Sequence, residues 1–69
     1  MGEVVVDARG LRCPLVALTA KRAMKKATRG QRVTVLADDK DAAMDLTALA
    51  ATMELKLEIE EIGRFVLIK

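Results

Sequence analysis

Apolar side chains recur along this chain with two different periods, which separate the predicted strands from the predicted helices. Residues 4–6 are consecutive valines and predict a short strand that ends at Asp7, whose carboxylate is expected to pair with an arginine. From Pro14 to about Thr28 the period becomes that of a helix with one apolar face. The residues expected on this buried face are Val16, Ala20, Ala23, Met24 and Ala27. Gly30 is expected to end the helix, and the alternating residues 32–37 predict a second strand.

The second half of the chain repeats this order and adds a final strand. Asp38, Asp39 and Asp41 are expected to cap and open a second helix that runs to about residue 53. Its predicted buried stripe consists of Ala42, Leu46, Leu49, Ala50 and Met53. The period then falls to two, with Leu55, Leu57 and Ile59 on one side of a strand. Gly63 turns the chain into a last strand over residues 65–68.

The order β-α-β-α-β-β predicts an α/β fold. We expect a two-layer sandwich in which a four-stranded mixed sheet carries both helices on one face, because each helix must bury its apolar side against the strands. Strands should be parallel where a helix connects them and antiparallel in the closing hairpin. A chain of 69 residues fits one small domain over residues 1–69, with a compact core and modest stability.

The single cysteine and the single proline of the chain are adjacent, as Cys13 and Pro14. Pro14 suits the first position of a helix, because its φ is already helical and its missing N–H is not needed there. Cys13 would then lie beside unpaired N–H groups and the positive end of the helix dipole, which favour a thiolate. Arg9 and Arg12 act in the same direction, and Gly10 can adopt a positive φ that leaves backbone amides facing an anion. This pattern predicts a reactive thiol; the competing interpretation is a buried cysteine that only packs.

The motif Asp7-Ala8-Arg9-Gly10-Leu11-Arg12-Cys13-Pro14 resembles the signature of the TusA/SirA family of small sulfur-carrier proteins. The resemblance extends to chain length and to the order of elements, so it covers essentially all 69 residues. It implies the same two-layer fold and a cysteine that carries sulfur as a persulfide. One position differs, since the family pattern has a second proline two residues after the first and this chain has Val16 there.

Composition excludes several classes of function. One cysteine and no histidine rule out a structural zinc site and a Cys-His hydrolase within the chain, so we expect neither a metal nor a cofactor. The carboxylates near residue 39 are better explained by helix capping than by binding of a hard cation. Phe65 is the only aromatic residue, so base stacking and direct nucleic-acid binding are not expected. With no apolar run of about 18 residues, no signal peptide and no possible internal disulfide, we expect a cytoplasmic monomer without membrane association.

Charge is distributed unevenly along the chain. Residues 8–37 contain eight basic residues and no acid, whereas residues 38–69 contain eight acids and four basic residues. On the outer side of the first helix, Leu15 and Leu18 fall among basic residues instead of on the buried stripe. The basic members of this group are Lys21, Arg22 and Lys25. We expect this surface to dock an acidic partner, while the simpler interpretation is a solvated face that provides solubility.

These observations favour a sulfur carrier over an enzyme that turns over a substrate. Cys13 would accept a sulfane sulfur from a donor of the cysteine desulfurase or rhodanese type and pass it to an acceptor protein by transpersulfidation. The resemblance implies tRNA thiolation, molybdenum cofactor assembly or sulfur oxidation as destinations. Two alternatives remain open: a noncatalytic binding or regulatory module whose basic helix face contacts an acidic protein or an RNA backbone, and a thiol redox sensor that needs an external resolving thiol.

Overall fold

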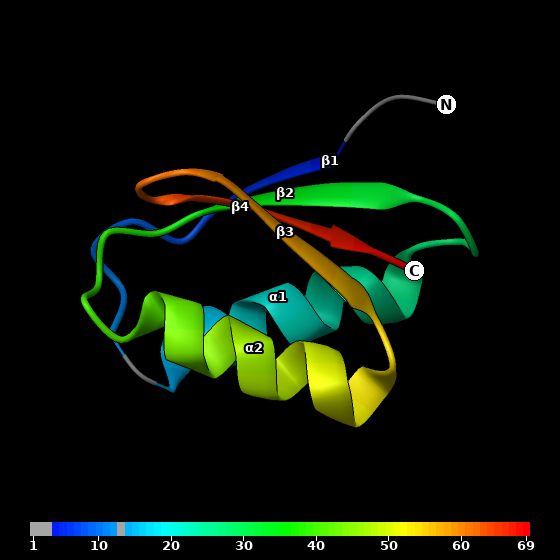
Figure 1. Cartoon of the computed structure of the whole chain (residues 1–69), viewed down its shortest axis with the longest axis horizontal. Coiled ribbons are helices and arrows are strands. Elements are labelled where there is room, and N and C mark those ends of the chain that lie inside the picture. The colour runs from blue at the N-terminus through cyan, green and yellow to red at the C-terminus, as the bar shows by residue number, and fades with distance from the viewer. Residues whose placement is uncertain (1–3, 13) are drawn as a thin grey trace.

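The computed structural model describes residues 4–12 and 14–69, and it has two helices packed against one face of a four-stranded sheet (Figure 1). The predicted α/β class and two-layer arrangement are confirmed, and the predicted boundaries differ from the observed ones by a residue or two. The elements are β1 (Val4–Asp7), α1 (Leu15–Lys26), β2 (Arg32–Leu36), α2 (Ala42–Met53), β3 (Lys56–Glu61) and β4 (Arg64–Ile68).

The strands follow the order β1-β2-β4-β3 across the sheet. β1 and β2 are parallel neighbours, with α1 as the connection between them, and Val4 lies opposite Val33. β4 is antiparallel to both β2 and β3, so β2 and β3 run in the same direction without pairing. The strands that each helix connects therefore run parallel, as predicted, but only those connected by α1 are neighbours, because β4 lies between the two that α2 connects.

The core lies between the helices and the sheet. Both predicted helical stripes are confirmed: Val16, Ala20 and Met24 of α1 are fully buried, and four of the five predicted residues of α2, Leu46 among them, are buried. The remaining predicted members, Ala23, Ala27 and Met53, are partly buried against this core. The sheet contributes the alternate residues of its two central strands, Val33, Val35, Phe65 and Leu67. This packing fixes the two helices and therefore the loops that precede them.

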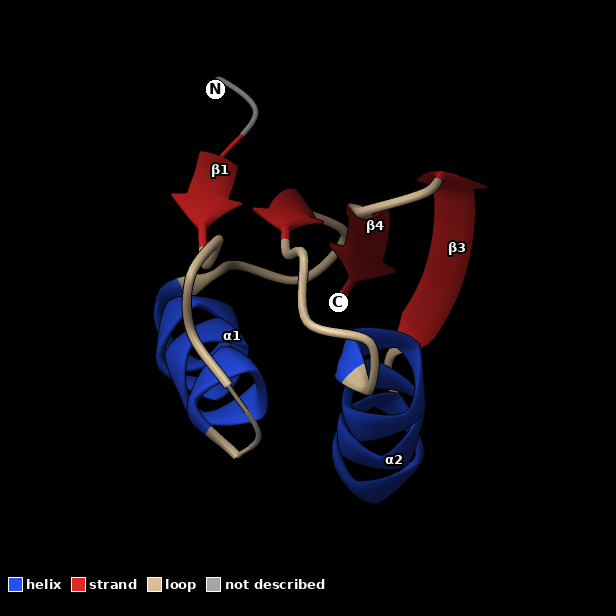
Figure 2. Ribbon diagram, turned by 90° about the vertical axis from the view of Figure 1, so that its left-hand side faces the viewer, coloured by secondary structure: helices blue, strands red, loops and turns tan. Residues whose placement is uncertain are grey.

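The β1–α1 loop, the β2–α2 loop and the β3–β4 turn meet at one end of the molecule, which faces the viewer in Figure 2. The backbone N–H of Ala37 donates to the carbonyl of Gly63 across 3.0 Å and so ties the β3–β4 turn to the β2–α2 loop. Gly63 has φ of +82°, and a Cβ at this position would lie 2.9 Å from the Ala37 carbonyl oxygen. Glycine is therefore required there both for its backbone angle and for space.

Candidate functional site

The β1–α1 loop, which contains the predicted sulfur site, is anchored where it leaves the sheet. Ala8 is completely buried, and its N–H donates to the Leu36 carbonyl at 2.7 Å, which extends the pairing of β1 with β2 by one residue. The N–H of Leu11 then donates to the Ala8 carbonyl at 3.2 Å and closes a turn. Gly10 lies within this turn with φ of +85°, which confirms the positive φ predicted for it. The first part of the loop, residues 8–11, is thus positioned by the sheet.

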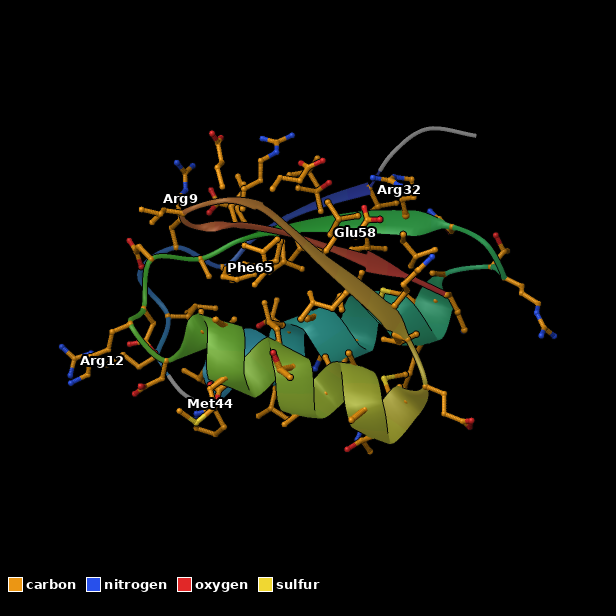
Figure 3. All side chains as sticks on the ribbon, viewed as in Figure 1. Arg9, Arg12, Arg32, Met44, Glu58 and Phe65 are labelled. Carbon is orange, nitrogen blue, oxygen red and sulfur yellow. The ribbon has the colours of Figure 1, made fainter. Side chains whose placement is uncertain are left out.

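Arg9 is held by Asp7 at the start of the loop. Its Nε and Nη2 atoms donate to the two carboxylate oxygens of Asp7 at 2.9 and 2.8 Å, and its backbone N–H donates to Asp7 Oδ1 at 3.1 Å. These bonds lower the pKa of the Asp7 carboxyl from 3.8 to about 2. The predicted pairing of Asp7 with an arginine is confirmed, and the charge of Arg9 is offset by its partner. Arg12, by contrast, is exposed and points away from the helices and the sheet (Figure 3).

The amide of Gly10 binds a carboxylate from a distant loop. Its N–H donates to Asp38 Oδ1 at 2.9 Å, across a separation of 28 residues. The prediction that backbone amides of the loop are free to face an anion is therefore wrong for Gly10, because its amide already donates to the Asp38 carboxylate. Asp38 was also predicted to cap the second helix, and this too is wrong, since its carboxylate is bonded to Gly10. The bond joins the two loops that precede the two helices.

The remaining acidic residues of the β2–α2 loop act within that loop. Asp39 Oδ2 accepts a hydrogen bond from the Asp41 N–H at 3.2 Å. Asp41 occupies the N-cap position of α2 as predicted, but its side chain forms no capping hydrogen bond. Its carbonyl accepts the helical bond from the Asp45 N–H at 3.0 Å. The helix start is thus held by backbone bonds and by the Asp39 carboxylate, not by a side-chain cap from Asp41.

Pro14 lies at the N-cap position of α1, with φ of −97°, and the helix begins at Leu15. The predicted place of Pro14 inside the first turn is therefore wrong by one residue: its carbonyl accepts the first helical bond, from the Leu18 N–H at 3.0 Å. Cys13, the predicted reactive residue, lies outside the described residues. Val16, at the position of the family's second proline, is completely buried, so this side chain contributes to the core.

The residues predicted to dock a partner lie on the exposed side of α1. Leu15 and Leu18 are 49% and 47% exposed. The basic residues Lys21, Arg22 and Lys25 are also exposed. Positions three and four apart share one side of a helix, so these leucines and cations form one surface, which we call the basic helix surface. Its use as a docking site remains a prediction.

Sequence analysis missed a second exposed apolar group. Ile62 in the β3–β4 turn is 103% exposed and Ile59 is 58% exposed, although the alternation of β3 predicted Ile59 on the apolar side with Leu57. The pairing of β3 with β4 is irregular between Ile59 and Glu61, which ends the regular alternation there. The available signal was an isoleucine directly before the turn glycine, where polar residues are usual.

Within residues 4–12 and 14–69, no group of three or more His, Cys, Asp or Glu side chains is arranged to hold a metal ion. Neither helix of this described part has the length and apolar character needed to cross a membrane.

The fold and the loop define a small α/β protein whose single cysteine precedes a helix. Residues 4–69 match the family described as Sulfurtransferase TusA, and the chain belongs to this TusA/SirA family. The recognition made from the Cys13-Pro14 motif is confirmed.

Individual relatives agree with this assignment. The chain is 48% identical over 46 residues to YrkI of Bacillus subtilis, a protein named as a candidate sulfur carrier; the match covers 67% of this chain and 61% of that relative. It is 39% identical over 62 residues to sulfur carrier protein TusA of Allochromatium vinosum, covering 87% of this chain and 82% of the relative. The crystal structure of a SirA-like protein from Desulfitobacterium hafniense superposes with a TM-score of 0.73 at 30% identity, covering 93% of this chain and 90% of that one.

Proposed function

We propose that this protein is a sulfur carrier, which accepts a sulfane sulfur on Cys13 and delivers it to an acceptor protein. The observation that carries the proposal is the single thiol of a TusA-family chain, in a loop that is hydrogen-bonded to the sheet and to a neighbouring loop. The names of the relatives support the same role. The donor would be a protein persulfide, of the kind formed by a cysteine desulfurase or a rhodanese.

The chemistry consists of two thiol exchanges. The Cys13 thiolate attacks the terminal sulfur of the donor persulfide, a new S–S bond forms, and the donor cysteine leaves as a thiolate. An acceptor thiolate then attacks the terminal sulfur of the Cys13 persulfide, and the Cys13 thiolate leaves unchanged. The carrier needs no cofactor for these steps, because the transferred sulfur keeps its oxidation state throughout. In both steps the Cys13 sulfur is a thiolate anion, as the attacking group in the first step and as the leaving group in the second.

Arg12 and the first turn of α1 are the groups best suited to stabilise that anion. Arg9 is paired with Asp7 and the Gly10 amide is bonded to Asp38, so neither is free for this task. The Leu15 N–H donates to the Arg12 carbonyl at 2.6 Å, whereas helix geometry leaves the N–H groups of the next two residues of α1 without intrahelical acceptors, and the first turn contains no acidic residue. A thiolate or persulfide next to Pro14 would therefore meet positive potential from the helix start and from the adjacent Arg12.

Intact mass spectrometry tests the proposal. The reduced protein is incubated with a cysteine desulfurase and cysteine, and we expect the mass of one added sulfur atom, which a reductant removes. Cys13→Ala should gain no sulfur. Absence of the adduct with every sulfane donor tried, or an equal adduct on Cys13→Ala, would contradict the proposal.

A matched pair of variants tests the source of the positive potential. Arg12→Met should slow alkylation of Cys13 by iodoacetamide near neutral pH several-fold, because it removes the positive charge adjacent in the chain. The double variant Asp7→Asn, Arg9→Met removes a neutral ion pair from the same loop and should change the rate much less. Equal rates in all three proteins would show that Arg12 has no such effect.

A further inference from the structure

The end of the molecule that contains the Cys13 loop has a second surface, a groove between the β3–β4 turn and the β2–α2 loop. Its volume is about 320 Å³, and we call it the hairpin groove. The lining residues that matter here are Ile59, Ile62 and Phe65, which are apolar, and Asp38, Asp39 and Glu61, which are acidic. In Figure 3 Phe65 lies between the sheet and α2, and with 5% exposure it forms the closed side of the groove.

The turn itself does not require the apolar side chain of Ile62. Gly63 has a positive φ and Ile62 does not, so glycine alone meets the special backbone requirement. Turn positions favour small or polar residues, yet Ile62 places a β-branched side chain wholly in solvent. Ile59 on the neighbouring strand is also mainly exposed. Exposed apolar side chains that share a groove with a polar rim are typical of a protein interaction site.

The groove is connected to the Cys13 loop by direct bonds. The Ala37 N–H holds the carbonyl of Gly63 at 3.0 Å, so the turn is fixed against the β2–α2 loop. The next residue, Asp38, lines the groove and accepts the Gly10 N–H at 2.9 Å. Gly10 precedes Cys13 by three positions. A segment bound in the groove would therefore contact the residue that holds the sulfur loop.

The charge of the groove identifies its partner. Three of its lining residues are acidic and one, Lys40, is basic, whereas the basic helix surface of α1 has only cations around its leucines. We propose that the hairpin groove binds a segment of a partner protein in which an aliphatic side chain is flanked by lysine or arginine. The inference builds on the proposed function, in which the carrier meets a donor and an acceptor in turn. Opposite charge would direct these two proteins to different sides of the same loop.

A peptide titration tests this assignment. Isotope-labelled protein with Cys13→Ser, which cannot form a disulfide, is titrated by NMR with two synthetic peptides of equal length and identical leucines. One peptide has lysine and the other glutamate at every charged position. We expect the lysine peptide to shift the backbone amides of residues 37–40 and 59–63, and the glutamate peptide to shift those of α1.

The same substitution at two apolar surface residues, one in the groove and one on α1, decides the result. Ile62→Asp should weaken binding of the lysine peptide at least about tenfold, as loss of an interface anchor does. Leu18→Asp makes the same change on α1, at a residue that is 47% exposed, and should leave this binding unaltered. Three results would overturn the proposal. They are an unchanged affinity of Ile62→Asp for the lysine peptide, lysine-peptide shifts confined to α1, and groove amide signals that shift with protein concentration alone. The last result would identify a second copy of the chain as the occupant.

The titration is independent of sulfur transfer. The protein used contains no thiol, so a failure of persulfide formation on Cys13 leaves the peptide result unchanged. Conversely, normal persulfide formation on Cys13 together with no binding of the lysine peptide in the groove would refute the groove assignment and leave the proposed function standing.

Discussion

Replacement of Gly63 by alanine should destabilise the protein more than the same change at two other glycines with the same backbone angle. Gly10, Gly30 and Gly63 have φ of +85°, +86° and +82°, a region that costs an alanine about 1–2 kcal/mol. A Cβ on Gly10 or Gly30 would meet nothing within 4 Å, but on Gly63 it would lie 2.9 Å from the Ala37 carbonyl oxygen. All three variants therefore have the same backbone strain, and only Gly63→Ala has a steric clash in addition.

The size of the difference in stability follows from which part of the structure must move to relieve the clash. Backbone cannot rotate aside as a side chain does, so the turn must separate from residue 37. That movement weakens the hydrogen bond from the Ala37 N–H to the Gly63 carbonyl, now 3.0 Å long, which contributes about 1 kcal/mol. Gly63→Ala should thus cost about 2–3 kcal/mol in the free energy of unfolding, against about 1–2 for each control. A domain of this length has only about 3–10 kcal/mol in total.

Urea unfolding measures this difference. The chain contains no tryptophan or tyrosine, so far-ultraviolet circular dichroism is the suitable signal. The unfolding midpoint of Gly63→Ala should fall below those of Gly10→Ala and Gly30→Ala, with an unchanged dependence on urea. Equal midpoints for the three variants would refute the reasoning that the turn is locked against the β2–α2 loop.

Two further predictions concern charged side chains. The pKa of Asp7, about 2 in the folded protein, lies below its ordinary value of 3.8, so its pairing stabilises the fold above about pH 4 and this contribution is lost as the pH falls towards 2. Asp7→Asn should therefore make the urea midpoint fall less between about pH 4 and pH 2. A fall as large as that of the unmodified protein would contradict this prediction. Lys69 Nζ donates to the carbonyls of Met24 and Ala27, each at 3.0 Å, so Lys69→Met should cost about 1–2 kcal/mol and speed amide exchange at the end of α1. The same change at Lys56, an exposed lysine of β3, is the control, and equal exchange in both variants would argue against a capping role.

The secondary structure could be predicted from the sequence because burial repeats with the period of each element. Met24 and Leu46 lie on the predicted helical stripes and are fully buried. The position of β4 between β2 and β3 could not be predicted in this way. The alternation of apolar and polar residues shows which side of a strand faces the core, but this pattern does not depend on which strand is its neighbour in the sheet.

The site was predictable only where its interactions are local. Asp7 and Arg9 are two residues apart, and their pairing was anticipated. The bond from the Gly10 amide to Asp38 joins residues that are 28 positions apart, so it could not be predicted from local sequence. An aspartate just before a helix is predicted to be a cap, whichever group its carboxylate binds in the folded protein. Ile62 was missed for a related reason, because periodicity assigns apolar residues to a core and contains no information on contacts with other molecules.

The central place of β4 has a consequence for synthesis. The ribosome releases β1, α1, β2, α2 and β3 before β4, yet β4 supplies the neighbour that both β2 and β3 pair with. Until β4 emerges, β3 has no strand beside it and one edge of β2 is open, and open edges favour association with other chains. The nascent domain therefore completes its sheet only after all six elements have been made, later than the loop that carries the thiol.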